Sequence, residues 1–303
     1  MDSRTGKKIR LGRILDAHSH RAIIVAASHA VLTGAPSGLR TAADMNTVFS
    51  QLEGANGIMV APGSVQLVEE AFVGREKPSL VLHMDWKSHG RKVFRPGESG
   101  ISEGSVASLA TVDRVAAAGA DAIMSYLYVG HKDNSLERQE VERNAQLAAD
   151  CARLGIVLII EPRAVMDYTD RAQVANPELL GWYCRMAAEI GADVVKCIWP
   201  GTRGAYEDIV SQTTVPVVLA GGPGNDDRIE ETMRLAEDTV LAGGSGVMFG
   251  RRIYSSKRPS AVLAGLKAVI HDGATADDGL ALFLDLVSQG VVQNSEHPDT
   301  ERP

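Results

Sequence analysis

Short, continuous apolar runs recur along the chain and are separated by longer stretches in which apolar residues return every three or four positions. Continuous apolar runs are typical of strands that are buried on both faces, and the longer periodic stretches are typical of helices. Eight runs predict strands: Ala22–Ala27, Gly57–Ala61, Leu80–Met84, Asp121–Tyr126, Ile156–Ile160, Asp193–Ile198, Val215–Ala220 and Gly246–Phe249.

Two of the intervening stretches carry clear helix signals. Asn134–Leu154 is apolar at helical spacing among Glu and Arg residues, and Pro177–Ile190 follows Asn176, a favourable N-cap residue. Gly119 and Gly191 each begin a Gly-Ala-Asp sequence that connects a predicted helix to the next predicted strand. A glycine just past a helix adopts a left-handed backbone conformation at no steric cost.

This alternation of strands and helices predicts an α/β fold with parallel strands. Eight βα units favour a single (β/α)₈ TIM barrel with an eight-stranded parallel sheet, and a doubly wound open sheet is the alternative. The 303 residues suit one barrel of ~250 residues with extensions. We expect a lead-in segment over residues 1–20, the catalytic barrel over 21–290 and a flexible C-terminal tail over 291–303.

Composition narrows the range of functions. The net charge is −7 with scattered basic residues, and aromatic residues make up 5%, which argues against a nucleic-acid partner. No apolar run reaches the ~18 residues of a membrane span, and no signal peptide is evident. Cys151, Cys184 and Cys197 lack C-x-x-C spacing, which argues against disulfides and thiolate zinc sites. We expect a cytoplasmic protein with no membrane partner.

Lys196 is the most unusual residue of the pattern because it interrupts an apolar strand. Burial disfavours the ammonium form and can lower the pKa of a lysine by ~3–5 units. The neutral amine that results is the nucleophile needed to form an imine with a ketone. The alternative is a structural lysine that reaches solvent or pairs with a carboxylate across the barrel.

Polar groups also follow three other predicted strands. Gly221 and Gly222 follow the seventh strand and Gly250 and Arg251 the eighth, where barrels often bind phosphate through backbone N–H groups; plain tight turns are the alternative. In the fourth strand, period-two alternation places Tyr126 and Tyr128 on one side. A tyrosine beside a cationic lysine can shuttle a proton; the alternative is that both hydroxyls serve only as hydrogen-bonding groups.

Over almost its whole length the sequence resembles the class I fructose-bisphosphate aldolases of archaeal type and their deoxyribose-phosphate-aldolase-like relatives, which include 2-amino-3,7-dideoxyheptulosonate synthases. The segments that carry the resemblance are Gly6–Arg13, Leu127–Gly130, Pro162-Arg163, Gly191–Lys196, Ala220–Pro223 and Gly250–Tyr254. The resemblance implies that Lys196 is the Schiff-base lysine and Tyr128 the proton-transfer residue. It further implies that Tyr126 and Arg163 contact substrate, and that Gly221, Gly222, Gly250 and Arg251 bind phosphate.

The sequence departs from the family after the first strand, where the usual D-H-G is replaced by Ser28-His29-Ala30. We expect Ser28 and His29 to contact substrate without the family's carboxylate. The loop Trp86–Gly104 follows the third strand on the face that holds barrel active sites. Asp85, Lys87 and His89 could supply the missing acid–base group or bind a second polar substrate; a solvated loop is the alternative.

The resemblance implies a class I aldolase that makes or cleaves a C–C bond of a ketose phosphate, with a donor of the dihydroxyacetone-phosphate type. The intermediate is a covalent lysine imine, so no metal or other cofactor is expected, and the partner is a small phosphorylated carbonyl substrate. An alternative within the family is a synthase that joins a ketose phosphate to an amino-acid-derived aldehyde or transfers a three-carbon unit to an aminoheptulosonate-type product. Homo-oligomers are common among such relatives, so we expect one here.

Two interpretations outside the aldolases remain open. Asp16, His18 and His20 form the D-x-H-x-H motif of metal-dependent amidohydrolases, in which two histidines at i and i+2 share a metal ion. However, these histidines precede the first predicted strand, and no aspartate stands at the eighth. The second interpretation is a non-catalytic, ligand-binding barrel, for which the missing carboxylate of the first strand is the only support.

Overall fold

The computed structural model of the chain describes residues 2–88, 105–165, 176–222 and 228–295. Eight parallel strands form a closed barrel in the order β1-β10-β9-β8-β7-β6-β3-β2. The strands are β1 (Ala22–Ala26), β2 (Gly57–Val60), β3 (Ser79–His83), β6 (Ala122–Val129), β7 (Val157–Ala164), β8 (Val194–Cys197), β9 (Val217–Ala220) and β10 (Gly246–Phe249). The predicted TIM barrel is confirmed, and because β1 pairs with both β2 and β10 the open-sheet alternative is wrong.

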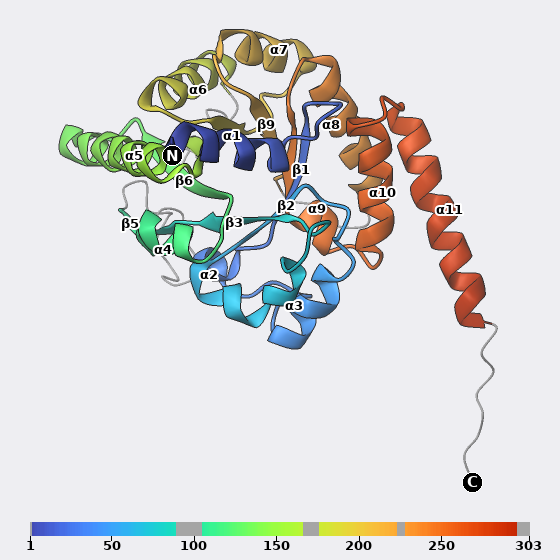
Figure 1. Cartoon of the computed structure of the whole chain (residues 1–303). Helices are drawn as coiled ribbons and strands as arrows, with labels where there is room; N and C mark the ends of the chain where they lie inside the picture. Colours follow the sequence, from blue (N-terminus) through green and yellow to red (C-terminus); the bar gives the residue numbers. More distant parts are fainter. Residues whose placement is uncertain (1, 89–104, 166–175, 223–227, 296–303) are drawn as a thin grey trace, which may run out of the picture.

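Helices surround this barrel (Figure 1). They are α1 (Ser3–Ile14), α2 (Ala30–Thr33), α3 (Ala42–Phe49), α4 (Val112–Ala117), α5 (Asn134–Leu154), α6 (Pro177–Ile190), α7 (Arg203–Gln212), α8 (Ile229–Leu241), α9 (Arg251–Tyr254), α10 (Pro259–Ile270) and α11 (Ala276–Ser295), with 3₁₀ turns η1 (Pro62–Leu67) and η2 (Glu69–Ala71). Figure 1 shows α10 and α11 side by side on one flank, with α11 extending beyond the barrel. This helix continues to Ser295, into the segment expected to be a tail, and residues 296–303 lie outside the described residues.

The predicted helix boundaries have clear local causes. The Asn176 side chain accepts hydrogen bonds from the N–H groups of Glu178 and Leu179, so it caps α6 as expected. Helix α5 ends at Leu154 and is capped by Gly155, whose φ of 70° is left-handed. Gly119 and Gly191 also have positive φ values, 78° and 120°, as their place in the Gly-Ala-Asp steps predicts.

Alternation along the strands separates the apolar residues into two clusters. One cluster packs between the strands and the helices, and the other fills the barrel interior. Ile14 at the end of α1 belongs to the interior cluster and is fully buried, so α1 contributes to the core of the barrel. Val194 is an interior residue, and Lys196, two positions later on β8, therefore lies on the same side.

The barrel closes between β1 and β10, where Ala22 is paired with Gly246. Gly246 has a φ of 103°, and a Cβ atom there would lie 2.0 Å from the carbonyl oxygen of Ala22. Only glycine fits this backbone, so the closure requires the residue that the sequence provides.

A two-stranded antiparallel hairpin that was not predicted stands beside the barrel. It consists of β4 (Asp85–Lys87) and β5 (Val106–Ser108), and it brackets the long loop after β3. Its three-residue strands are too short to produce a periodic signal. Most of the loop, including His89, lies outside the described residues, so the expectation for it as a lid or substrate loop stays a prediction.

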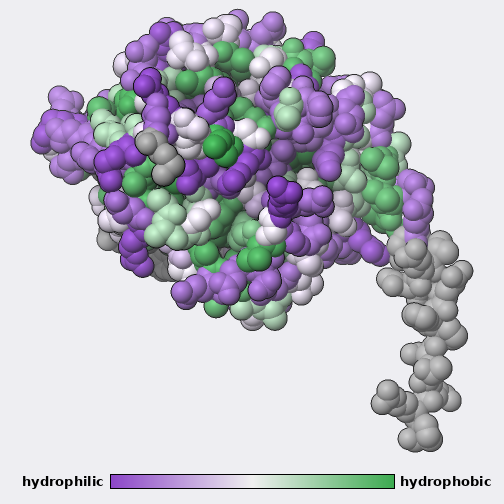
Figure 2. All heavy atoms as spheres, in the orientation of Figure 1, coloured by the Kyte–Doolittle hydropathy of each residue, from purple (hydrophilic) through white to green (hydrophobic). Residues whose placement is uncertain are grey.

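The described helices include none that is both long enough and apolar enough to cross a membrane. On the face seen in Figure 2, hydrophilic residues predominate and apolar residues form separate groups between them. The largest apolar residues of the strands are instead enclosed in the two clusters.

Candidate active site

Charged and aromatic side chains gather at the C-terminal end of the barrel, around a cavity of about 640 Å³. Most of the predicted site residues line this cavity, although they come from different strands. They are His29, Lys87, Tyr126, Arg163, Lys196, Gly221, Gly222, Gly250 and Arg251. Ser28, Asp85 and Tyr128 are buried around the cavity without lining it.

Lys196 forms a buried ion pair with Glu161 of the neighbouring strand β7. The distance from Lys196 Nζ to Glu161 Oε2 is 2.7 Å, and the two side chains are 9% and 4% exposed. Arg163 Nη1 lies 3.3 Å from the other carboxylate oxygen. Burial by itself raises the pKa of Glu161, but the charges of Lys196 and Arg163 outweigh it and hold that pKa below its ordinary value.

This ion pair bears on both interpretations of Lys196. The lysine is buried, as the catalytic interpretation requires, and it also has the carboxylate partner that the structural interpretation offered. The carboxylate comes from the adjacent strand and not from across the barrel. The two interpretations are therefore compatible, because the partner that neutralises the ammonium is also a base within reach of its proton.

A second pair, Lys87 of β4 and Tyr128 of β6, lies beside the cavity, and only Lys87 lines it. Lys87 Nζ donates a hydrogen bond of 2.6 Å to Tyr128 Oη and lies 4.4 Å from the centroid of the Tyr126 ring. Tyr126 and Tyr128 both belong to the interior cluster, so their predicted position on the same side is confirmed. The hairpin that the sequence pattern did not predict is thus the element that delivers Lys87.

Asp85 lies beneath this pair and does not reach the cavity. It is fully buried, and it accepts hydrogen bonds from Arg143 Nη1 at 2.9 Å and Ser125 Oγ at 3.1 Å. Burial raises its pKa to about 6, although the charge of Arg143 acts in the opposite direction. Arg143 also pairs with Glu140, which accepts the backbone N–H of Tyr128. These contacts do not support substrate binding by Asp85; they fix the hairpin to β6 and α5.

Ser28 is likewise buried, and its Oγ lies 3.0 Å from Nδ1 of His83. The sequence pattern did not single out His83, the last residue of β3. His29 lines the cavity, and its Nδ1 lies 3.0 Å from the hydroxyl of Tyr254. Burial, followed by the charge of Arg251, lowers the pKa of His29 to about 4, so its imidazole is neutral near pH 7.

The two glycine turns pack tightly against the barrel. A Cβ atom at Gly250 would lie 2.5 Å from the Ala26 carbonyl oxygen, and one at Gly221 would lie 2.9 Å from the Phe249 ring. Arg251 lines the cavity, whereas its neighbour Arg252 is buried and hydrogen-bonds the Gly221 carbonyl oxygen. Arg252 thereby joins the two turns, a role that the sequence did not reveal. Residues 223–227, which include Pro223 of the expected phosphate turn, lie outside the described residues.

The D-x-H-x-H motif lies in a different part of the molecule. It forms a turn before β1, in which the Asp16 carboxylate accepts the backbone N–H groups of His18 and Ser19. The motif therefore stands at the N-terminal end of the barrel, away from Lys196. Among the residues that the structure describes, no group of three or more His, Cys, Asp or Glu residues is placed to hold a metal ion.

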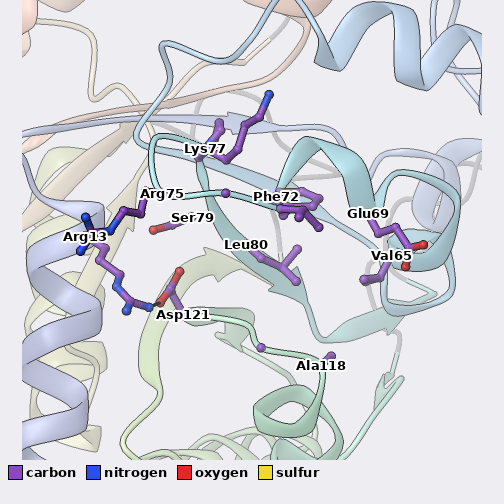
Figure 3. Close-up of a pocket in the computed structure, with 14 residues that line it drawn as sticks. Arg13, Val65, Glu69, Phe72, Arg75, Lys77, Ser79, Leu80, Ala118 and Asp121 are labelled. Carbon is purple, nitrogen blue, oxygen red and sulfur yellow. Dashed lines mark hydrogen bonds and ion pairs between the residues drawn. The ribbon is translucent and has the colours of Figure 1, made fainter.

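A larger cavity, of about 780 Å³, opens at that N-terminal end (Figure 3). Arg13 of α1 and Asp121, just before β6, point toward each other there and form an ion pair of 3.0 Å. Arg75 and Lys77 also line it. The Arg13 side chain is 62% exposed, so this ion pair is of the solvated surface type.

Comparisons with known proteins bear on this site. A family model described as DeoC/LacD family aldolase matches residues 22–256. An uncharacterised aldolase of Saccharolobus solfataricus is 28% identical over 92% of this chain and 99% of its own length. The 2-amino-3,7-dideoxy-D-threo-hept-6-ulosonate synthase of Halobacterium salinarum is 29% identical over 91% of this chain and 96% of its own.

The fold is shared with a solved structure of an archaeal fructose 1,6-bisphosphate aldolase. The TM-score is 0.71 at 21% identity, over 88% of this chain and all of the other. The matched family segment contains every strand of the barrel and each residue that lines the cavity at its C-terminal end. The resemblance inferred from sequence motifs is therefore confirmed, and the chain belongs to the DeoC/LacD family of aldolases.

Proposed function

We propose that the chain is a class I aldolase in which Lys196 forms an imine with the ketone of a phosphorylated three-carbon donor. The observation that carries the proposal is the buried pair of Lys196 and Glu161 at the C-terminal end of the barrel. A lysine with a carboxylate at 2.7 Å has a base that can accept its proton when a ketone approaches.

The charges in the site suit this covalent step. Lys196 begins as an ammonium, passes its proton to Glu161 and attacks the carbonyl carbon to give a carbinolamine. Glu161 then returns the proton to the carbinolamine hydroxyl, which leaves as water, and a protonated imine remains. Both the ammonium and the protonated imine carry one positive charge. Glu161 therefore keeps an ionic partner before and after imine formation, and little rearrangement of the buried charges is needed.

Tyr128 and Lys87 supply the proton transfer of C–C cleavage. Lys87 Nζ donates a hydrogen bond to Tyr128 Oη, which would stabilise the phenolate form of this tyrosine; in that form Tyr128 accepts the proton of the substrate hydroxyl two carbons from the imine carbon. The C–C bond breaks, its electron pair moves into the protonated imine to give an enamine, and the aldehyde leaves. Tyr128 then returns the proton to the enamine carbon, and water hydrolyses the imine. Synthesis follows the same steps in reverse.

The remaining groups of the cavity suit an anionic end of the substrate. Arg251 and the turns at Gly221 and Gly250 stand beside one another, since β9 and β10 are paired. Backbone N–H groups and a guanidinium form charge-assisted hydrogen bonds with a phosphate. The substrate is then a small phosphorylated carbonyl compound, and the chemistry needs no further cofactor.

A second candidate is a synthase of the same family, which would use the same imine to build a C–C bond with a different acceptor. The observation that favours it is the Halobacterium relative named as a heptulosonate synthase, which aligns over 91% of this chain. Both candidates share Lys196 and differ in the acceptor, so a panel of aldehydes offered to the trapped donor distinguishes them.

The experiment is reduction of the protein with borohydride in the presence of dihydroxyacetone phosphate, followed by peptide mass spectrometry. The expected result is one adduct, on Lys196, that is lost in Lys196→Met and kept in Lys267→Met, a matched control on helix α10. An adduct on another lysine, or no adduct with a folded protein, would overturn the proposal.

A further inference from the structure

One buried imidazole at the C-terminal end of the barrel has no part in the steps above. His83 is fully buried, and its Nδ1 atom lies 3.0 Å from Ser28 Oγ. Its other ring nitrogen, Nε2, is buried and has no hydrogen-bond partner among the described residues. Buried polar atoms in folded proteins almost always have a partner, so an unpaired ring nitrogen beside a cavity indicates a ligand or water contact.

His83 does not itself line the cavity at the C-terminal end of the barrel, but it packs directly behind a residue that does. Its ring packs edge-on against Tyr126, which lines the cavity, at 5.4 Å between centroids. Burial, and then the charges of Lys196 and Lys87, lower the pKa of His83 to about 3. The imidazole therefore stays neutral at the pH of the reaction, with one nitrogen as donor and the other as acceptor.

Ser28 determines how this imidazole can be used. The serine hydroxyl can either donate to Nδ1 or accept from it, and the choice fixes whether Nε2 donates or accepts. Either way, the Ser28–His83 pair is an uncharged hydrogen-bonding group, with Ser28 just after β1 and His83 at the end of β3. A carboxylate accepts only, whereas this pair can donate to a substrate oxygen without adding charge near Lys196.

We propose that His83 Nε2 binds the free hydroxyl group of the donor ketone, on the carbon next to the carbonyl, and that Ser28 positions the ring. The inference rests on the proposed function, because the imine at Lys196 holds the ketone in place. A site built to hydrogen-bond a hydroxyl discriminates strongly against a ligand that lacks it, since the protein group is then left unpaired. His83 is thus a specificity-determining residue for hydroxylated donors.

Two ketones that differ in this single hydroxyl test the proposal. They are dihydroxyacetone phosphate and hydroxyacetone phosphate. The second has a methyl group where the first has a hydroxymethyl group. Titration with borohydride trapping gives an apparent dissociation constant for the imine complex of each. Wild-type protein is expected to bind the hydroxylated ketone about tenfold more tightly, the size of one well-formed hydrogen bond. His83→Leu is expected to bind both ketones equally, with the value for the methyl ketone unchanged.

Three further variants separate positioning from packing. Ser28→Ala is expected to lose part of the preference and Ser28→Thr, which keeps the hydroxyl, to restore it. Met59→Leu, a volume-conserving change at another interior residue, is expected to leave the preference intact. His83→Asn, which keeps a polar side chain, replaces His83→Leu should the latter fail to fold.

The outcomes are distinct. Equal weakening of both ketones in His83→Leu or His83→Asn would assign His83 a structural role and overturn the inference. Equal binding of both ketones by the wild-type protein would also overturn it, while leaving imine formation at Lys196 intact. If borohydride traps neither ketone on Lys196, the proposed function itself is refuted, and so is the inference that depends on it.

Discussion

The two ends of the barrel differ in a way that cavity size does not reveal. The N-terminal end has the larger cavity, about 780 Å³ against about 640 Å³, and both cavities are lined by arginine side chains. At the N-terminal end Arg13 pairs with Asp121 while 62% exposed; at the C-terminal end Lys196 and Glu161 pair at 9% and 4% exposure. Buried ions cost several kcal/mol to desolvate, whereas exposed pairs cost little, so the buried charges favour the C-terminal end as the site of the proposed chemistry.

The largest expected effect comes from separating Lys196 from Glu161. Lys196→Met is expected to lower turnover by on the order of 10⁴-fold or more, because no nucleophile remains. It also leaves a buried carboxylate without its main partner, which costs about 3–5 kcal/mol of unfolding free energy in comparable pairs. Urea unfolding and aldehyde release from a ketose phosphate measure the two quantities.

The double variant Lys196→Met/Glu161→Gln sharpens this test. Removing both charges is expected to recover most of the lost stability and none of the activity, because the buried carboxylate is then replaced by a neutral amide. If the double variant is as unstable as Lys196→Met, the loss of stability does not come from leaving the Glu161 carboxylate buried without its ionic partner. The contrast between the two ends would then lose its physical basis.

A smaller effect is expected at the hydrogen-bonded pair of Lys87 and Tyr128. Tyr128→Phe is expected to slow C–C cleavage by about 10²–10⁴-fold, the usual size of general acid–base catalysis, while borohydride trapping at Lys196 persists. Lys87→Met is expected to slow cleavage through its effect on the same hydroxyl. The double variant Lys87→Met/Tyr128→Phe should therefore cleave the C–C bond nearly as fast as Tyr128→Phe alone. Unchanged cleavage in Tyr128→Phe would remove this residue from the mechanism.

Two histidines at the C-terminal end of the barrel also predict a loss of stability in acid. Burial lowers the folded-state pKa values of His83 and His29 to about 3 and about 4, below the ordinary 6.5. The unfolded chain then binds more protons, so the free energy of unfolding falls as the pH drops from about 6.5 toward 3. Between pH 7 and pH 4 the part due to His83 is roughly 3 kcal/mol, at 1.36 kcal/mol per pKa unit. His83→Leu is expected to flatten this loss, which denaturant titrations between pH 7 and pH 4 measure.

The smallest effect is expected at the N-terminal end. Arg13→Gln and Arg75→Gln are expected to change turnover by less than about twofold and stability by roughly 0–1 kcal/mol, as for other exposed charges. Steady-state kinetics with the ketose phosphate check this. A tenfold change in turnover would show that the larger cavity takes part in function and would break the comparison.

Residue pattern alone predicted the eight strands and the ends of α5 and α6, because buried parallel strands and capped helices leave local signals. Together with the family resemblance, it also selected nine of the residues that line the cavity at the C-terminal end of the barrel. It did not predict the β4–β5 hairpin, whose strands have only three residues each. The surroundings of Asp85 could not be predicted for a related reason: its partner Arg143 is 58 residues away in the chain.

Glu161 and His83 could have been found by the alternation that placed Tyr128. Each follows interior apolar residues at two-residue spacing near the C-terminal end of its strand, as Ser28 and Lys196 also do. A polar residue that continues an interior row is therefore a site candidate on the strength of the sequence alone. The distance between two such residues on different strands cannot be predicted in this way, because it depends on the stagger of the barrel.

The pairing of Ala22 with Gly246, which closes the barrel, has a consequence for folding during synthesis on the ribosome. The first strand to be synthesised must wait for the last, 224 residues later (246 − 22), before one of its edges is paired. At about 5–20 residues per second, this takes roughly 10–45 seconds. During that interval the nascent chain exposes an apolar, unpaired β1 edge, the kind of surface that chaperones protect from aggregation.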